Sequence, residues 1–92
     1  MYNISFIGAG NVTFRLSLAL QQAGYNIRTI VNRSADKAES VVRALKRHRS
    51  HAIATDDYNA IPADCDLIII SVSDTYIREA AKKVNETLTS RN

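Results

Sequence analysis

The sequence has few of the residues that mark specialised folds. It contains one cysteine, one proline, three glycines and no tryptophan among 92 residues. The single Cys65 excludes an internal disulfide framework, and only His48 and His51 accompany it, so no zinc-ligand spacing exists. The low glycine and proline content argues against collagen-like and disordered chains. We therefore expect no metal site and interpret Cys65 as a structural residue.

Long apolar runs are also missing. The longest comprises four residues, Leu67 to Ile70, which is too short to cross a membrane. The first residues, Met1 to Ile4, lack the basic and apolar segments of a secretory signal. We therefore expect a cytoplasmic protein with no membrane partner. With 46% hydrophobic residues, the chain has room for one compact domain spanning residues 1–92.

Positive charge is in modest excess and is locally concentrated. Twelve Lys and Arg against nine Asp and Glu give a net charge of +3, and the segment from Arg43 to Arg49 holds Lys46, Arg47 and His48 as well. Cations at the end of a predicted helix offset the negative end of its dipole. We favour this interpretation over a nucleic-acid site, because no aromatic side chains interleave with the cluster. No nucleic-acid partner is expected.

The first half of the chain alternates between strand and helix patterns. The segment Asn3 to Ile7 predicts a short buried strand, and Asn26 to Asn32 a second one. Between them, apolar residues at helical spacing predict a helix over Asn11 to Ala23, with Gly24 as its left-handed cap. Ser34 is expected to cap a second helix. The expected buried faces are Val12, Leu16, Ala19 or Leu20, and Ala23 in the first helix, and Ala38, Val41, Val42 and Leu45 in the second.

The second half repeats the pattern less clearly. A weak strand is expected at Ala52 to Thr55, followed by a loop or a single helical turn that ends near Pro62. The segment Leu67 to Val72 does not alternate between apolar and polar residues, which is typical of a parallel strand covered by helices on both faces. Asp74 is expected to cap the last helix. The apolar residues at helical spacing in that helix are Ile77, Ala80, Ala81, Val84 and Leu88.

This order of elements predicts an α/β fold. Strands joined by helices form a parallel sheet through right-handed crossovers. We expect a Rossmann-like sheet of about four strands, in the order 3-2-1-4, with flanking helices. No fifth strand follows to cover the outer edge of the last strand, so we expect either that the chain is the N-terminal part of a longer enzyme or that this edge is buried against a second copy.

The glycine turn after the first strand is the main functional motif. Gly8 allows a tight turn, and Gly10 lets the backbone approach a pyrophosphate at the N-terminus of the next helix. The pattern follows a predicted strand and opens a predicted helix, which favours a dinucleotide site over a merely structural turn. Thr13 stands where the fingerprint has Gly or Ala, so the first helix must pack with a branched hydroxyl residue and a lower affinity is expected.

The end of the second strand favours NADP over NAD. An NAD site has an acidic residue here that binds the ribose 2′-hydroxyl. This chain instead has Asn32, Arg33 and Ser34, and Lys37 lies one turn into the helix. Arg33 can pair with a 2′-phosphate and Ser34 can donate its hydroxyl, although a solvated Arg33 and a merely capping Ser34 remain the alternative.

The second wall of the site is expected at the end of the last strand. Ligands of doubly wound sheets bind at the carboxyl ends of strands, beside the point where the strand order reverses. Ser71 and Ser73 could therefore contact the ribose or pyrophosphate. The tyrosines at positions 25, 58 and 76 are interpreted as packing or rim residues, because no partner base is identifiable near them. No catalytic residue is assigned.

Together, the segments Ile7 to Val12, Asn32 to Ser34 and Asp66 to Asp74 resemble those of a known group. They are similar to the N-terminal domain of Rossmann-like NADP oxidoreductases related to pyrroline-5-carboxylate reductase and to deazaflavin-dependent NADP oxidoreductases. The resemblance covers nearly the whole chain. It implies that the pyrophosphate meets Gly8, Gly10, Asn11 and Val12, that the 2′-phosphate meets Asn32, Arg33 and Ser34, and that Ser71, Val72 and Ser73 lie on the nicotinamide side. Ala9 and Lys37 are also expected at the cofactor site. It also implies a helical C-terminal domain, absent here, that supplies dimer contacts and much of the substrate pocket.

Two hypotheses of different classes follow for the function. The leading one is that the chain is the NADP-binding portion of an oxidoreductase that transfers hydride to a small carbonyl or imine substrate. This portion alone is expected to be inactive without the rest of the enzyme. The alternative is a non-catalytic nucleotide-binding or interaction module. A methyltransferase is disfavoured, because its ribose also requires an acidic residue where Asn32 stands. The expected partners are a small-molecule substrate and, in the full-length protein, a second subunit.

Overall fold

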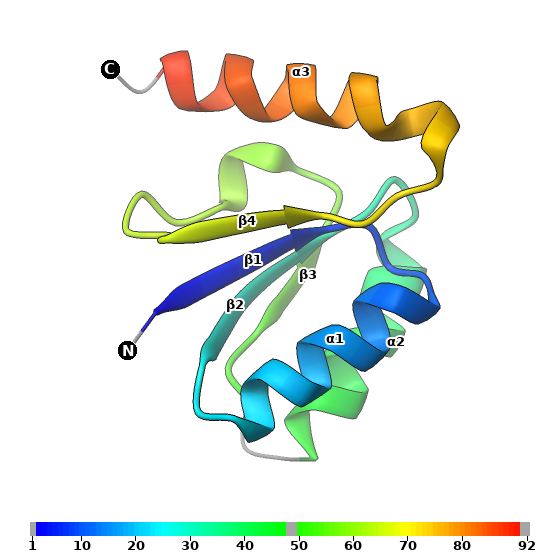
Figure 1. The fold of residues 1–92 in the computed structure, drawn as a ribbon, viewed down its shortest axis with the longest axis vertical. Coiled ribbons are helices and arrows are strands. Elements are labelled where there is room, and N and C mark those ends of the chain that lie inside the picture. The colour runs from blue at the N-terminus through cyan, green and yellow to red at the C-terminus, as the bar shows by residue number, and fades with distance from the viewer. Residues whose placement is uncertain (1, 48–49, 91–92) are drawn as a thin grey trace.

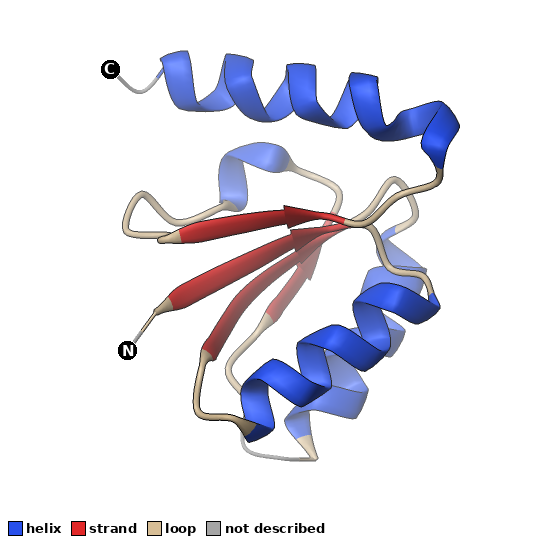
Figure 2. Ribbon diagram, in the orientation of Figure 1, coloured by secondary structure: helices blue, strands red, loops and turns tan. Residues whose placement is uncertain are grey.

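The computed structural model describes residues 2–47 and 50–90, which form a layered α/β structure around one parallel sheet (Figures 1 and 2). The sheet has four strands in the order β3-β2-β1-β4, and every pairing is parallel. The order confirms the prediction. The strands are β1 (Asn3–Ile7), β2 (Asn26–Val31), β3 (Ile53–Thr55) and β4 (Leu67–Ile70).

Helices cover the two faces of the sheet. On one face lie α1 (Asn11–Gln22) and α2 (Ala35–Lys46); on the other lie α3 (Asp74–Ser90) and the short 3-10 helix η1 (Tyr58–Ala60) (Figure 1). The loop or single helical turn that was expected to end near Pro62 is η1. The carboxyl ends of β1, β2 and β4 meet at the same edge of the sheet, where the connections to the three helices begin (Figure 2).

The α2 helix forms as its sequence pattern predicts. Ser34 adopts an extended conformation and its hydroxyl accepts a hydrogen bond from the Lys37 amide, which satisfies one of the free N–H groups of the first turn. Asp36 lies in the first turn and Arg43 and Lys46 in the last, as the helix dipole favours. The C-cap is Arg47, whereas the predicted contribution of His48 and Arg49 lies outside the described residues.

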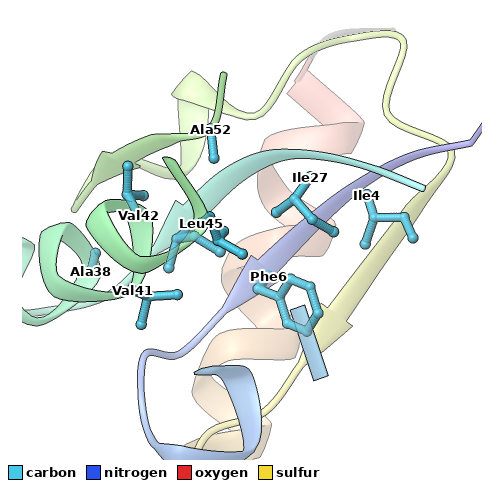
Figure 3. Packing of buried hydrophobic residues seen from close by; sticks show 9 residues of the cluster. Ile4, Phe6, Ile27, Ala38, Val41, Val42, Leu45 and Ala52 are labelled. Carbon is cyan, nitrogen blue, oxygen red and sulfur yellow. The ribbon is translucent and has the colours of Figure 1, made fainter. Parts of the chain in front are cut away.

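The main core lies between α2 and the sheet. Alternate residues of β1 point toward this helix, and Ile27 and Ile30 of β2 do so on either side of a register shift in the strand pair (Figure 3). All nine buried members are 4% exposed or less, and full burial of a Val, Leu, Ile or Phe side chain contributes about 1.5–3 kcal/mol. The members are Ile4, Phe6, Ile27, Ile30, Ala38, Val41, Val42, Leu45 and Ala52.

A smaller core lies on the other face of the sheet. Ile7, Val31, Ile61 and Ala80 are buried together there, beneath α3 and η1. Val84 and Tyr58 pack against them while remaining partly exposed. Because this core is small, α3 is held by fewer buried side chains than α2.

The expected inner faces of α1 and α3 are wrong in part. In α1 the buried residues are Thr13 and Ser17, whereas Val12 is 64% exposed and Leu16 is also exposed. In the described part of α3 the buried residues are Ala80 and Thr87. Small side chains allow each helix to approach its neighbours closely, so the larger apolar residues turn outward. These include Ile77 and Leu88 of α3, and Ala81 is exposed as well.

The β4 strand lies at the edge of the sheet. Within residues 2–47 and 50–90 it pairs with β1 alone, and its Leu67 is 50% exposed while the three isoleucines are half-buried. The expectation of coverage on both faces is therefore wrong for Leu67, and no described strand pairs with the outer edge of β4. No helix in the described residues is long and apolar enough to cross a membrane.

Candidate functional site

The turn between β1 and α1 depends on Gly8. Its φ of +118° is a conformation that residues with a Cβ rarely adopt. A Cβ at this position would lie 2.5 Å from the Ser71 carbonyl oxygen, which is a backbone atom that cannot move aside cheaply. The Gly8 amide also donates a hydrogen bond to the Val31 carbonyl over 2.7 Å. Gly8 thus fixes the close approach of the β1, β2 and β4 ends.

Gly10 has a different role, because its backbone is ordinary. Its φ of −85° suits any residue, and a Cβ built there would meet nothing within 4 Å. The fold therefore does not need glycine at position 10. The lack of a side chain instead leaves open space directly before the first turn of α1, where a ligand could approach the backbone.

The α1 N-terminus is free to bind an anion. Gly10 is its N-cap, no side chain caps it by a hydrogen bond, and its first turn contains no acidic residue. The first N–H groups of a helix have no partners within the helix and lie at the positive end of its dipole. Thr13, the departure from the glycine fingerprint, is fully buried, and its hydroxyl hydrogen-bonds with that of Ser71. This contact ties α1 to the end of β4.

The β2 end presents a cation beside a second helix N-terminus. The Asn32 backbone amide donates to the Thr55 carbonyl, and its side-chain amide donates to the Ser34 carbonyl over 3.0 Å. These two bonds hold the loop in which Arg33 is exposed. Lys37, in the first turn of α2, lines the same cleft.

The β4 end supplies the opposite wall. The Ser71 amide donates to the Ile7 carbonyl over 2.8 Å, so the chain leaves β4 in register with β1. Ser73 is the residue before α3 and accepts a hydrogen bond from the Tyr76 amide over 2.8 Å. The helix therefore starts at Asp74, one residue earlier than expected, with Asp74 in its first turn rather than at the cap.

These three strand ends enclose one cleft of about 400 Å³. The structure brings ten of the twelve predicted cofactor residues to its lining. Asn11 and Val12 do not line it; both side chains are exposed on the first turn of α1. The ten lining residues are Gly8, Ala9, Gly10, Asn32, Arg33, Ser34, Lys37, Ser71, Val72 and Ser73.

The α3 wall of the cleft was not predicted from the sequence, although Tyr58 and Tyr76 were expected to be packing or rim residues and both line the cleft. It is formed by Tyr76, Glu79, Ala80 and Lys83 of α3, with Tyr58 of η1 beside them. Residues 76, 79, 80 and 83 recur every three or four positions, so they share one face of the helix. That spacing is visible in the sequence. The apolar residues of α3 were, however, expected to form its inner face, whereas Tyr76, Glu79 and Lys83 face the cleft.

The charges of the cleft are predominantly positive. Arg33, Lys37 and Lys83 line it with one carboxylate, Glu79, which pairs with Lys83 over 3.4 Å. A hydrogen bond with Tyr76 first, and the electrostatic interaction with Tyr76 second, raise the pKa of Arg33. Burial raises the pKa of Tyr58, and the nearby charge of Lys83 opposes this. Arg33 is therefore charged and Tyr58 neutral at neutral pH, and the excess of cationic side chains in the cleft suits a polyanionic ligand.

A second hollow, of about 480 Å³, lies by the exposed edge of the sheet and is mainly apolar. It lies between Leu16 and Leu20 of α1 and Leu67 and Ile69 of β4, and Asp66 is the charged residue among its described lining residues. It is similar in size to the cleft, yet its described lining contains neither a cation nor a helix N-terminus. The chemistry of the cleft is therefore better suited to a phosphate group than that of the hollow.

The described residues contain no group of three or more His, Cys, Asp or Glu that could hold a metal ion. Cys65 is half-buried, and its thiol lies 3.2 Å from the Leu67 carbonyl and 3.4 Å from the Ser5 hydroxyl. These contacts fit the structural role expected of it. The candidate site is the cleft, which is lined by cationic side chains and by glycine and serine residues at the strand ends.

Comparison with known proteins yields one family. The protein-family model described as Shikimate / quinate 5-dehydrogenase matches residues 1–92. A search of curated proteins finds no match. The resemblance expected from the motifs is supported at the level of a Rossmann-like, dinucleotide-binding domain, and the relationship to pyrroline-5-carboxylate reductase is not shown.

Proposed function

The chain belongs to the shikimate / quinate 5-dehydrogenase family, and from that premise we propose that its cleft binds NADP in preference to NAD for hydride transfer with a small carbonyl or imine substrate. Family membership gives a dinucleotide-binding portion of an oxidoreductase. The choice of NADP and of the substrate class is our proposal. The observation that carries it is the meeting of Arg33, Lys37 and two helix N-termini in one cleft.

The pyrophosphate is proposed to bind at the N-terminus of α1. The absence of a side-chain cap and of first-turn acids leaves backbone N–H groups for phosphate oxygens. Open space next to Gly10 fits the close backbone approach that a pyrophosphate requires. A β-carbon there would project into this space, so the residues present fit the cofactor.

The adenosine 2′-phosphate is proposed to bind at the β2 end. A carboxylate at this position would repel a phosphate and favour NAD, whereas Asn32 is neutral and Arg33 cationic. The planar guanidinium of Arg33 can donate two parallel hydrogen bonds to phosphate oxygens. Lys37 adds a second positive charge, and the α2 N-terminus a third source of positive potential.

The bound cofactor would supply the hydride, and the chain would supply its position. Ser71, Val72 and Ser73 line the wall opposite Arg33 and leave β4 next to the glycine turn. They are proposed to hold the nicotinamide side, which is the part of the cleft that must meet a substrate. No residue of this chain is proposed as a proton donor.

Calorimetric titration with NADPH and NADH tests the proposal. We expect tighter binding of NADPH, and we expect Arg33→Ala to weaken NADPH binding by about ten- to hundredfold, since a hydrogen bond to a charged group contributes about 1.5–3 kcal/mol. NADH binding should change little. Arg43→Ala is the matched control, because Arg43 is an exposed arginine of α2 that pairs with Glu39 and does not line the cleft. Equal affinity for both cofactors in the wild type would contradict the assignment.

Turnover needs a separate experiment. A screen of small carbonyl and imine compounds, followed by the near-ultraviolet absorbance of NADPH, would detect hydride transfer in the longest natural form of the protein. Oxidation of NADPH with one class of compound would identify the substrate class. Binding of NADPH without oxidation by any compound would favour the alternative, a non-catalytic nucleotide-binding module.

A further inference from the structure

Arg33 and Tyr76 meet across the cleft. The Arg33 Cζ atom lies 4.4 Å from the centroid of the Tyr76 ring, which is cation–π distance. Arg33 comes from the loop after β2, and Tyr76 comes from the first turn of α3. The contact therefore links two walls of the cleft that are distant in sequence.

Tyr76 is the better anchored of the two residues. Its backbone belongs to a 17-residue helix, and its amide donates to the Ser73 carbonyl over 2.8 Å. Tyr76 is 40% exposed and lines the cleft, so part of the residue faces solvent. Arg33, by contrast, is an exposed long side chain with several rotatable bonds on a loop. The ring restricts the position of the guanidinium more than the guanidinium restricts the ring.

The contact with Tyr76 leaves most of the hydrogen-bonding capacity of Arg33 available. A guanidinium has five N–H donors in its plane, and the hydrogen bond with Tyr76 uses only part of this set. Among the described residues, no carboxylate forms an ion pair with Arg33, and Glu79 of the same wall pairs with Lys83 over 3.4 Å. A phosphate can therefore bind to the remaining N–H groups of Arg33 while the guanidinium stays beside the Tyr76 ring.

We infer that Tyr76 is a positioning residue that holds Arg33 ready for a phosphate monoester, and so determines selectivity for the 2′-phosphorylated nucleotide. This inference rests on the proposed function. A side chain that is already ordered loses less conformational entropy when its ligand binds. The effect should act on ligands that carry a 2′-phosphate and not on those that lack it.

The size of the effect follows from the exposure of the contact. An exposed cation–π pair contributes about 0.5–1 kcal/mol, which corresponds to about a two- to fivefold change in a dissociation constant. Loss of the ring should therefore weaken binding of a 2′-phosphorylated nucleotide by about two- to fivefold. The affinity of the nucleotide without that phosphate should stay the same.

The experiment uses adenosine 2′,5′-bisphosphate and adenosine 5′-monophosphate as probes in calorimetric titrations. The variants are Tyr76→Leu, which removes the ring, and Tyr76→Phe, which retains it, each with Arg33 present and with Arg33→Ala. We expect Tyr76→Leu to lower the ratio of the two affinities about two- to fivefold. Tyr76→Phe should keep the wild-type ratio of the two affinities. In the Arg33→Ala background, neither Tyr76→Leu nor Tyr76→Phe should change that ratio. Thermal unfolding of each variant checks that the fold is retained.

Three results would overturn the inference. Equal weakening of both probes by Tyr76→Leu would make Tyr76 a plain wall of the cleft, and an unchanged ratio would make it dispensable. If Tyr76→Phe lowered the ratio of the two affinities as much as Tyr76→Leu, the effect would come from the Tyr76 hydroxyl and not from the ring. In each of these cases a wild-type preference for the bisphosphate keeps the proposed function intact. A wild type without that preference contradicts both proposals together.

Discussion

The same substitution should have different effects at the two glycines of the β1–α1 turn: Gly8→Ala should lower the stability of the fold, and Gly10→Ala should weaken cofactor binding. Gly8→Ala places a Cβ in a backbone conformation with φ of +118° and 2.5 Å from the Ser71 carbonyl oxygen. Strain of this kind costs about 1–3 kcal/mol, and forcing atoms into a packed region costs about 1–3 kcal/mol more. A domain of this size has about 5–14 kcal/mol of stability in total. Gly8→Ala should therefore remove a large part of it.

Gly10→Ala should leave the fold almost unchanged. Its φ of −85° is allowed for alanine, and no atom lies within 4 Å of the new Cβ. Alanine is a poorer N-cap than glycine, which costs about 1 kcal/mol or less. The methyl group would, however, occupy the space in which we propose that the pyrophosphate approaches the backbone. Loss of even one charge-assisted hydrogen bond, about 1.5–3 kcal/mol, weakens NADPH binding at least about tenfold.

Urea unfolding followed by circular dichroism, together with calorimetric titration with NADPH, separates the two effects. We expect Gly8→Ala to lower the free energy of unfolding by about 2–6 kcal/mol. Gly10→Ala should unfold like the wild type within about 1 kcal/mol and bind NADPH at least about tenfold more weakly. Wild-type affinity in Gly10→Ala would refute a pyrophosphate at this turn. Wild-type stability in Gly8→Ala would refute the argument from its backbone conformation.

Three further substitutions test the packing of the domain and the exposed edge of its sheet. Thr13→Val removes the hydroxyl that bonds with Ser71, and the free energy of unfolding should fall by about 1 kcal/mol in urea titrations; an unchanged value would show that the bond adds nothing to stability. Thr29→Val removes a buried hydroxyl that has no hydrogen-bond partner among the described residues, so the free energy of unfolding should rise by about 1 kcal/mol in thermal and urea unfolding. A lower free energy of unfolding would contradict the absence of a partner. Leu67→Lys places a charge on the exposed edge strand, so light scattering at high protein concentration should show less self-association than in the wild type; equal association would mean that this edge is not the contact.

The sequence was sufficient to predict the sheet and its strand order, because these depend on strong local patterns. The α2 helix carries its N-cap and its whole buried face in the expected places, since Ser34 and four apolar residues at helical spacing act together. The glycine turn and the ends of β2 and β4 likewise converge as predicted, because carboxyl ends of parallel strands meet at one edge of a sheet.

The rotation of α1 and α3 was harder to predict, for a physical reason. Both helices turn small residues inward, such as Thr13 and Ala80, and leave larger apolar residues exposed. Hydrophobicity ranks residues by their preference for burial, whereas the inner faces here are selected by how closely the backbones approach. The same rotation brings Tyr76 and Lys83 to the cleft, so the wall formed by α3 could not be found from apolar spacing alone.

Amide NMR spectra recorded during titration with NADPH test the central claim most directly. If the cation-lined cleft binds the cofactor, the largest shifts should come from Gly10, Arg33 and Ser73, which line three sides of it. The amides of Leu16 and Leu67, beside the apolar hollow, should move little. Shifts concentrated at Leu16 and Leu67, with Gly10 and Arg33 unmoved, would contradict the assignment of the dinucleotide to this cleft.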